Sequence, residues 1–159
     1  MQHDVTTGKV MTYSEMVSNV TKMASALKKR GLKLEDVVLM MASNYIETAV
    51  SMFSIMKAGG SCASLTLNLF PGNLPKKKKK FIWFITTCFI VAVWHEEDIK
   101  KRASSVRAKF VVTDEARAGR VLDAVKQLDC VQEVFVIGQA EGCTPIDELF
   151  KDDGAGWQR

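Results

Sequence analysis

The sequence contains only two histidines, His3 and His95, and its four cysteines form no closely spaced pair. Zinc sites and histidine-based catalytic sites need such residues in a recognisable spacing, so neither kind of site is expected. No apolar segment follows Met1, which argues against a secretory signal. Scattered cysteines in such a chain favour reduced thiols and an intracellular location. The cysteines are Cys62, Cys88, Cys130 and Cys143.

A broad basic surface is also missing, although the formal net charge is +4. The chain has 22 Lys and Arg against 18 Asp and Glu, and five of the lysines form the single run Lys76–Lys80. Without that run the basic residues number 17, one fewer than the acidic residues. The basic excess is therefore local, which argues against a surface that binds nucleic acid.

The sequence lacks both common glycine motifs of nucleotide-binding loops, G-x-G-x-x-G and G-x-x-x-x-G-K-[ST]. Such loops follow a strand and open a helix, whereas Gly59-Gly60 follows a helical pattern and precedes a strand pattern. These glycines are predicted to end a helix, and Thr6–Lys9 to form a turn. The acidic groups Glu96–Asp98 and Asp152–Asp153 are expected to be solvated charge. No catalytic, cofactor-binding or metal-binding residue is predicted.

Helical and strand-like segments alternate along most of the chain. Apolar residues recur at helical spacing within 12–31, 44–60, 96–107 and 115–128. Short apolar runs at 36–42, 61–67, 109–114 and 131–138 are typical of strands in a covered sheet. A short helical turn is predicted within 145–150. Because such alternation implies βαβ units, the predicted fold class is α/β, with a partial, mostly parallel sheet flanked by helices.

The expected helix starts carry capping signals. Thr12 and Glu15 have the three-residue spacing of a capping box, and Asn44 and Glu47 repeat that pattern. Asp114 ends a strand pattern, and its short acidic side chain predicts an N-cap for the next helix.

Four segments together resemble a known family. They are MTYSEM at 11–16, MKAGGSCASLTLN at 56–68, AKFVVTDE at 108–115 and VFVIG at 134–138. In this order they resemble the N-terminal part of the adenylate-forming superfamily, with the nearest likeness to acyl-CoA ligases such as 4-coumarate–CoA ligase and to beetle luciferase. The T-Y-x-E-[LM] and K-A-G-G elements are the first two core motifs of that superfamily.

The resemblance implies a reaction for the parent family. Its members activate a carboxylic acid with ATP and Mg to an acyl-adenylate, then transfer the acyl group to coenzyme A. The family's phosphate loop, its Y-G-x-T-E segment and its catalytic lysine have no counterpart in this sequence. The chain is therefore expected to be a scaffold portion of such a ligase, inactive alone, with a cytoplasmic or peroxisomal location. The alternative is a small non-enzymatic α/β interaction module.

The stretch from Lys76 to Trp94 departs from the family pattern. Its apolar part, Phe81–Trp94, has 14 residues, about 21 Å as a helix and short of the ~30 Å bilayer core. Three interpretations compete for it: a membrane-spanning helix, an extra strand, or translated non-coding sequence. We favour the last. The lysine run beside it is expected to allow weak membrane-surface association. The expected organisation is a ligase-like segment 1–70, an atypical insertion 71–94, a second ligase-like segment 95–150 and a frayed tail 151–159.

Overall fold

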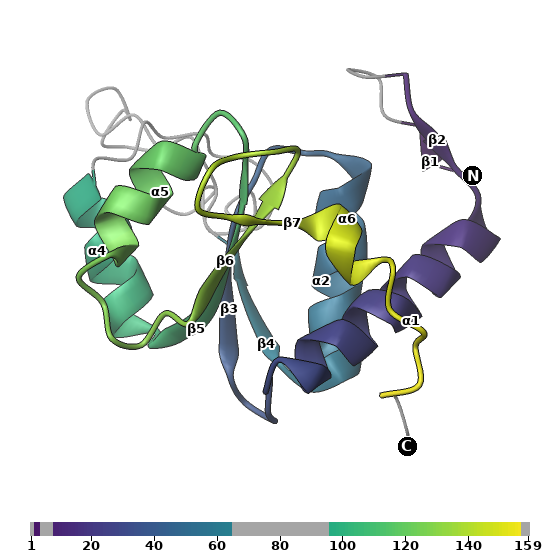
Figure 1. The fold of residues 1–159 in the computed structure, drawn as a ribbon, viewed down its shortest axis with the longest axis horizontal. Coiled ribbons are helices and arrows are strands. Elements are labelled where there is room, and N and C mark those ends of the chain that lie inside the picture. Colours follow the sequence, from purple (N-terminus) through teal and green to yellow (C-terminus); the bar gives the residue numbers. More distant parts are fainter. Residues whose placement is uncertain (1, 4–7, 65–95, 157–159) are drawn as a thin grey trace, which may run out of the picture.

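The computed structural model describes residues 2–3, 8–64 and 96–156 of the 159-residue chain (Figure 1). A five-stranded sheet in the order β4-β3-β5-β6-β7 forms its centre, and every neighbouring pair is parallel. These strands are β3 (Val37–Met41), β4 (Ser61–Ser64), β5 (Ala108–Asp114), β6 (Glu133–Ile137) and β7 (Thr144–Pro145). A separate antiparallel pair joins β1 (Gln2–His3) to β2 (Val10–Met11).

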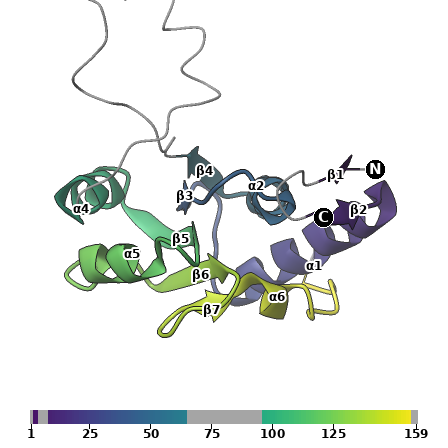
Figure 2. The ribbon, with the colours of Figure 1, turned by 90° about the horizontal axis from the view of Figure 1, so that it is seen from above.

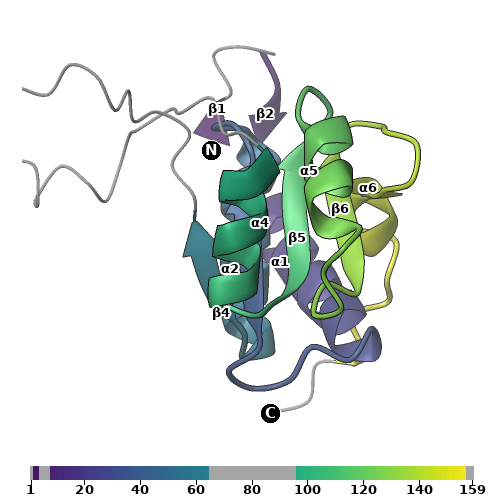
Figure 3. The same cartoon turned by 90° about the vertical axis from the view of Figure 1, so that its left-hand side faces the viewer.

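Helices cover both faces of the large sheet. They are α1 (Tyr13–Lys29), α2 (Ile46–Ala58), α4 (Glu96–Ser105), α5 (Ala118–Val125) and α6 (Ile146–Leu149). Figure 2 shows α4 and α5 on one side of the strands and α1, α2 and α6 on the other. In Figure 3, α4 and α5 lie in front of the sheet. The predicted α/β class with a mostly parallel sheet is confirmed.

The side chains of each central strand divide between two cores, because successive residues of a strand point to opposite faces. On β3, Val38 and Met40 pack with α1 and α2, whereas Leu39 and Met41 pack with α4 and α5. The first core also holds the two largest fully buried side chains, Phe110 and Phe135. Their ring centroids lie 5.5 Å apart in a tilted arrangement.

The start of α1 forms the capping box that the sequence predicts. The Thr12 hydroxyl accepts a hydrogen bond from the Glu15 backbone N–H, and the Glu15 carboxylate accepts one from the Thr12 N–H at 2.8 Å. Gly31 follows the helix with a φ of 90°, a conformation that glycine adopts without strain. The helix therefore begins and ends where its sequence signals lie.

The start of α2 differs from the prediction. Asn44 does not cap this helix: the N-cap residue is Tyr45, which makes no side-chain capping bond. Glu47 is buried and forms an ion pair with Lys9 instead of completing a capping box. The predicted end is confirmed, because Gly59 adopts the left-handed conformation with a φ of 92°.

The helix predicted at 115–128 is shorter, since α5 spans only Ala118–Val125. Asp114 is not its N-cap residue; that position belongs to Arg117, which makes no side-chain capping bond. Asp114 instead points its carboxylate across the sheet to the backbone of Ser43. Asp114 therefore links β5 to the loop after β3 and does not cap α5.

The tail is anchored where fraying is expected from the sequence. Lys29 of α1 pairs with Asp152 at 2.9 Å and with Asp153 at 2.8 Å, so this acidic pair is not simply solvated charge. The Gly156 N–H donates to the Ser25 hydroxyl at 2.9 Å. A Cβ atom at Gly156 would lie 2.7 Å from that hydroxyl, so glycine permits this close approach.

Part of the sequence-based reading falls on residues that the structure does not describe. Positions 71–94, the whole of the predicted insertion, lie outside the described ranges, and Cys88 is among them. The remaining cysteines, Cys62, Cys130 and Cys143, form no disulfide. Within the described ranges, no helix combines the length and the apolar character needed to cross a bilayer.

Candidate functional site

The carboxyl end of the parallel sheet holds a small polar network. Ligand sites of open α/β sheets usually lie at this edge. The last residues of β3 and β5 are neighbours here, with Met41 in register with Thr113. The loop after β3 contributes Ser43, the end of β5 contributes Asp114, and the start of α5 contributes Arg117.

Asp114 is the centre of this network and is only 2% exposed. Its Oδ2 atom accepts a hydrogen bond from the Ser43 N–H at 2.9 Å and forms an ion pair with Nη1 of Arg117. The same Nη1 atom donates to the Ser43 hydroxyl at 2.9 Å. The Oδ1 atom of Asp114 is buried and has no hydrogen-bond partner among the described residues.

The network fixes the ends of two strands and is poorly suited to hold an anion. The single positive charge, on Arg117, is compensated by Asp114 beside it. The described residues also contain no group of three His, Cys, Asp or Glu side chains that could hold a metal ion. The arrangement therefore joins the loop after β3 to the β5–α5 turn.

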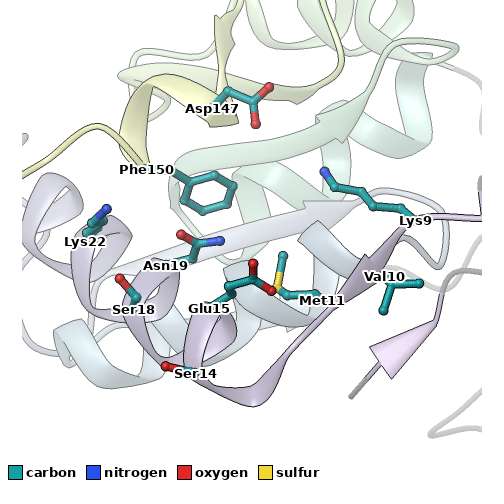
Figure 4. Close-up of a pocket in the computed structure, with 10 residues that line it drawn as sticks. All are labelled: Lys9, Val10, Met11, Ser14, Glu15, Ser18, Asn19, Lys22, Asp147 and Phe150. Atoms are coloured by element: carbon teal, nitrogen blue, oxygen red, sulfur yellow. The ribbon is translucent and has the colours of Figure 1, made fainter.

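A second site is a pocket between β2, the first turns of α1, and α6 (Figure 4). Its volume is about 550 Å³, within the range of sites for small molecules. Met11, Val10 and Phe150 supply apolar surface. The polar lining consists of Lys9, Ser14, Glu15, Ser18, Asn19, Lys22 and Asp147.

Two of the charged lining residues are engaged elsewhere in the fold. Lys9 pairs with the buried Glu47 at the start of α2. Glu15 completes the capping box, and the Thr12 backbone N–H is the main cause that lowers the pKa of its carboxyl. Lys22 and Asp147 form no hydrogen bond or ion pair with the described residues. The pocket thus offers one amine and one carboxylate that are free to interact with a ligand.

Sequence reasoning named no site residue, and neither site carries a motif that could have revealed it. Glu96 and Glu97 are exposed, as expected for solvated charge, and Gly59 ends a helix rather than forming a phosphate loop. The one available signal for the network was Asp114, an acidic residue directly after a buried strand. Its partner Ser43 is 71 positions away, so no local pattern connects them.

Comparison with known proteins decides the family. The model of the AMP-binding enzyme family matches residues 2–156. The chain belongs to the AMP-binding enzyme family. This confirms the resemblance drawn from the motifs around Thr12 and Gly59.

Relatives of this family member include ligases and peptide synthetases. It is 21% identical to 4-coumarate–CoA ligase 4 of Arabidopsis thaliana in an alignment 157 residues long, which covers 94% of this chain and 23% of that protein. It is 39% identical to nonribosomal peptide synthetase 7 of Aspergillus fumigatus over 54 residues, which is 34% of this chain and 2% of that protein.

Solved structures share the fold of this AMP-binding family member. The luciferase-like enzyme of the nonluminescent mealworm Zophobas morio gives a TM-score of 0.74 at 17% identity, over 99% of this chain and 32% of that one. A benzoate CoA ligase from Burkholderia xenovorans gives a TM-score of 0.65 at 16% identity, over 88% of this chain and 23% of that one. The chain therefore spans a third or less of the length of these proteins.

Proposed function

We propose that this chain is a scaffold portion of an ATP-dependent, carboxylate-activating acyl-CoA ligase and that it is inactive alone. The observation that carries the proposal is the contrast in coverage: the luciferase-like fold matches 99% of this chain but only 32% of that enzyme. A carboxylic acid, ATP and coenzyme A are the substrates of the parent reaction. An intracellular location, cytoplasmic or peroxisomal, belongs to the same proposal.

The described residues do not fit a nucleoside triphosphate, its Mg ion or coenzyme A. In the network at the carboxyl edge of the sheet, the positive charge of Arg117 is compensated by Asp114. The pocket residues carry two positive and two negative side chains, which gives no excess charge toward a triphosphate. We therefore assign no chemical step to side chains of this chain.

A direct test is ATP–pyrophosphate exchange by the purified chain with a panel of aromatic and aliphatic carboxylic acids. We expect no exchange above that of a heat-denatured sample, because no described group can stabilise a transferring phosphoryl group. Exchange that depends on one of the acids would overturn the assignment as an inactive portion.

The size of the native polypeptide gives a second test. An antibody raised against residues 113–137 should detect a band several times heavier than 17.7 kDa in the source tissue. Such a band supports a scaffold role within a longer ligase. A single band near 17.7 kDa would favour the alternative, a small interaction module.

A further inference from the structure

The pocket between β2, α1 and α6 contains polar side chains whose hydrogen-bonding capacity is not used within the fold. Asn19 and Lys22 are half-buried, yet neither forms a hydrogen bond or ion pair with the described residues. Asp147, on the facing helix α6, is likewise unpaired among the described residues. Half-buried polar groups gain by acquiring a partner, so Asn19 and Lys22 favour a polar ligand. Asp147 is exposed, and it lines the same pocket.

The sign and balance of charge restrict the class of that ligand. The lining holds two lysines and two carboxylates, but Lys9 is paired with Glu47 and Glu15 caps α1. The charges left for a ligand are the amine of Lys22 and the carboxylate of Asp147. A polyanion would be repelled by Asp147 and a polycation by Lys22. A ligand with one anionic and one cationic group matches both.

The apolar part of the lining calls for a compact hydrophobic body. In Figure 4 the Phe150 ring lies between Asp147 of α6 and Asn19 of α1. Met11, which is 6% exposed, and Val10 provide further apolar surface in the same pocket. Aromatic groups stack on or pack edge-to-face against such a ring, and methionine sulfur makes favourable contacts with them.

We propose that this pocket binds a small zwitterion with an aromatic body, with its carboxylate toward Lys22, its ammonium group toward Asp147 and its ring against Phe150. An aromatic amino acid has this chemistry. Ser14, Ser18 and Lys22 follow one another at four-residue spacing, so they form a continuous polar row along α1. This role is independent of the scaffold function.

The test uses three probes that differ by one charge. L-Phenylalanine carries both groups, L-phenylalaninamide lacks the carboxylate, and 3-phenylpropanoate lacks the ammonium group. Saturation-transfer NMR with the full chain measures the dissociation constant of each. We expect L-phenylalanine to bind most tightly, by about fivefold over either analogue, as expected for one partly exposed ion pair.

Variants assign each charge to its partner. Lys22→Met should remove the preference for L-phenylalanine over its amide, while Asp147→Asn should remove the preference over 3-phenylpropanoate. Lys101→Met on α4 and Glu148→Gln, adjacent to Asp147 on α6, are matched controls that should leave all three constants unchanged. Circular dichroism spectra check that each variant is folded.

Two outcomes would overturn the proposal. The first is equal binding of all three probes, or no saturable binding of any of them. The second is a preference for L-phenylalanine that survives both Lys22→Met and Asp147→Asn. Either result leaves the proposed scaffold function untouched, because that function is judged by pyrophosphate exchange and by the size of the native polypeptide.

Discussion

The two helical layers bury similar cores against the same sheet, but their outer surfaces differ. The layer of α4 and α5 turns charged side chains such as Lys101, Arg120 and Lys126 to solvent. In the part of the chain that the structure describes, every large hydrophobic side chain that is exposed belongs to the other side, between residues 10 and 56. These are Val10, Tyr13, Val17, Leu34, Met52, Phe53 and Met56.

This difference shows that the apolar residues of a helix are not all explained by contacts within the same chain. The helix α5 is apolar on one face only, as expected for a helix between a sheet and water. The helix α2 buries Val50 and Ile55 yet also exposes Met52, Phe53 and Met56. Exposed apolar patches of this kind mark surfaces that make further contacts or cause aggregation.

The largest effect that we expect is on association of the isolated chain. Phe53→Glu with Met56→Glu should convert a self-associating sample into a monomer, because charge replaces side chains that are 50% and 51% exposed. Arg120→Glu on α5 with Lys126→Glu at the C-cap of that helix is the control and should not dissociate the assembly. Sedimentation velocity distinguishes the outcomes. A wild-type chain that is already monomeric would refute the role given to the α2 surface.

Truncation of one buried side chain from each core should lower stability in proportion to the side-chain volume removed. Phe110→Ala is expected to lower the free energy of unfolding by about 3–5 kcal/mol, the usual range for a buried phenylalanine. Val111→Ala, on the next residue but in the other core, should cost about 2 kcal/mol for the methyl groups removed. Urea unfolding gives both values, and equal losses would contradict the expectation that the cost follows the volume of the side chain removed.

The network at the carboxyl edge should contribute less than the core. Asp114→Ala removes the acceptor of the Ser43 N–H and the partner of Arg117, so we expect a loss of about 2–3 kcal/mol. Thr113→Val is a matched control, because its buried hydroxyl makes only a long contact of 3.4 Å to the Met41 carbonyl oxygen. If the control loses as much stability as Asp114→Ala, the network is not what holds the loop after β3.

The N-terminal ends of α1 and α2 should differ by a smaller amount in what their capping residues contribute to stability. Thr12→Ala should lower the free energy of unfolding by about 1 kcal/mol, the typical effect of losing an N-cap. Asn44→Ala should change it by less than about 0.5 kcal/mol, because Asn44 is exposed and caps nothing. Thermal unfolding of both variants checks this, and the reverse order would show that α2 is capped by Asn44.

The smallest effect concerns the anchored tail and depends on pH. Burial alone raises the pKa of Asp152, but hydrogen bonds from Ser25, Lys29 and Gly154 together bring it well below its usual range. The hydrogen bond that the Lys29 ammonium group donates is the main cause that lowers the pKa of Asp153. The hydrogen bonds that Lys29 donates, first to Asp153 and then to Asp152, raise the pKa of Lys29.

These directions define the range in which the tail is anchored. The carboxylates stabilise the folded tail above their unfolded pKa, about 3.9, and lose that contribution as the pH falls through their lower folded values. Lys29 contributes fully below its unfolded pKa and loses its contribution as the pH rises through its higher folded value. The backbone ¹⁵N shift of Gly156 should therefore stay constant near neutrality and change at both extremes.

A variant isolates the anchor from the rest of the fold. Lys29→Met should release the tail at neutral pH and remove the alkaline transition of the Gly156 signal. Lys126→Met should not alter that signal, since Lys126 pairs with Asp123 on the opposite side of the sheet. A Gly156 shift that is unchanged in Lys29→Met would mean that the ion pairs do not hold the tail.

The fold was largely predictable because its signals are local. The apolar periodicity of each helix and the glycines that follow α1 and α2 can be seen within a short stretch of sequence. Both helices end where these glycines predict. The predicted capping box at Asn44 was wrong, because a cap requires a particular backbone conformation at the N-cap residue, and in α2 that residue is Tyr45. The strand β7 was missed because two residues, Thr144 and Pro145, carry no periodicity.

The candidate sites were not predictable, because they are made by tertiary contacts. Asp114 meets Ser43 only once β5 lies beside β3, and the pocket exists only because α6 packs against the start of α1. The anchored tail depends on a pairing between Lys29 and residues 123 and 124 positions away. Residues 151–159 are rich in glycine and charged residues, a composition that predicts a frayed end.

The division of β3 between two cores gives the protein a natural pair of spectroscopic probes. Met40 and Met41 are adjacent in sequence, yet their methyl groups belong to opposite sides of the sheet. With ¹³C-methyl methionine, both sides could be followed through a denaturant titration in one sample. Loss of the two native signals at the same urea concentration would identify a single cooperative unit, and separate midpoints would identify two. Two adjacent methionines on one short strand can thus show whether the two sides of the sheet unfold together.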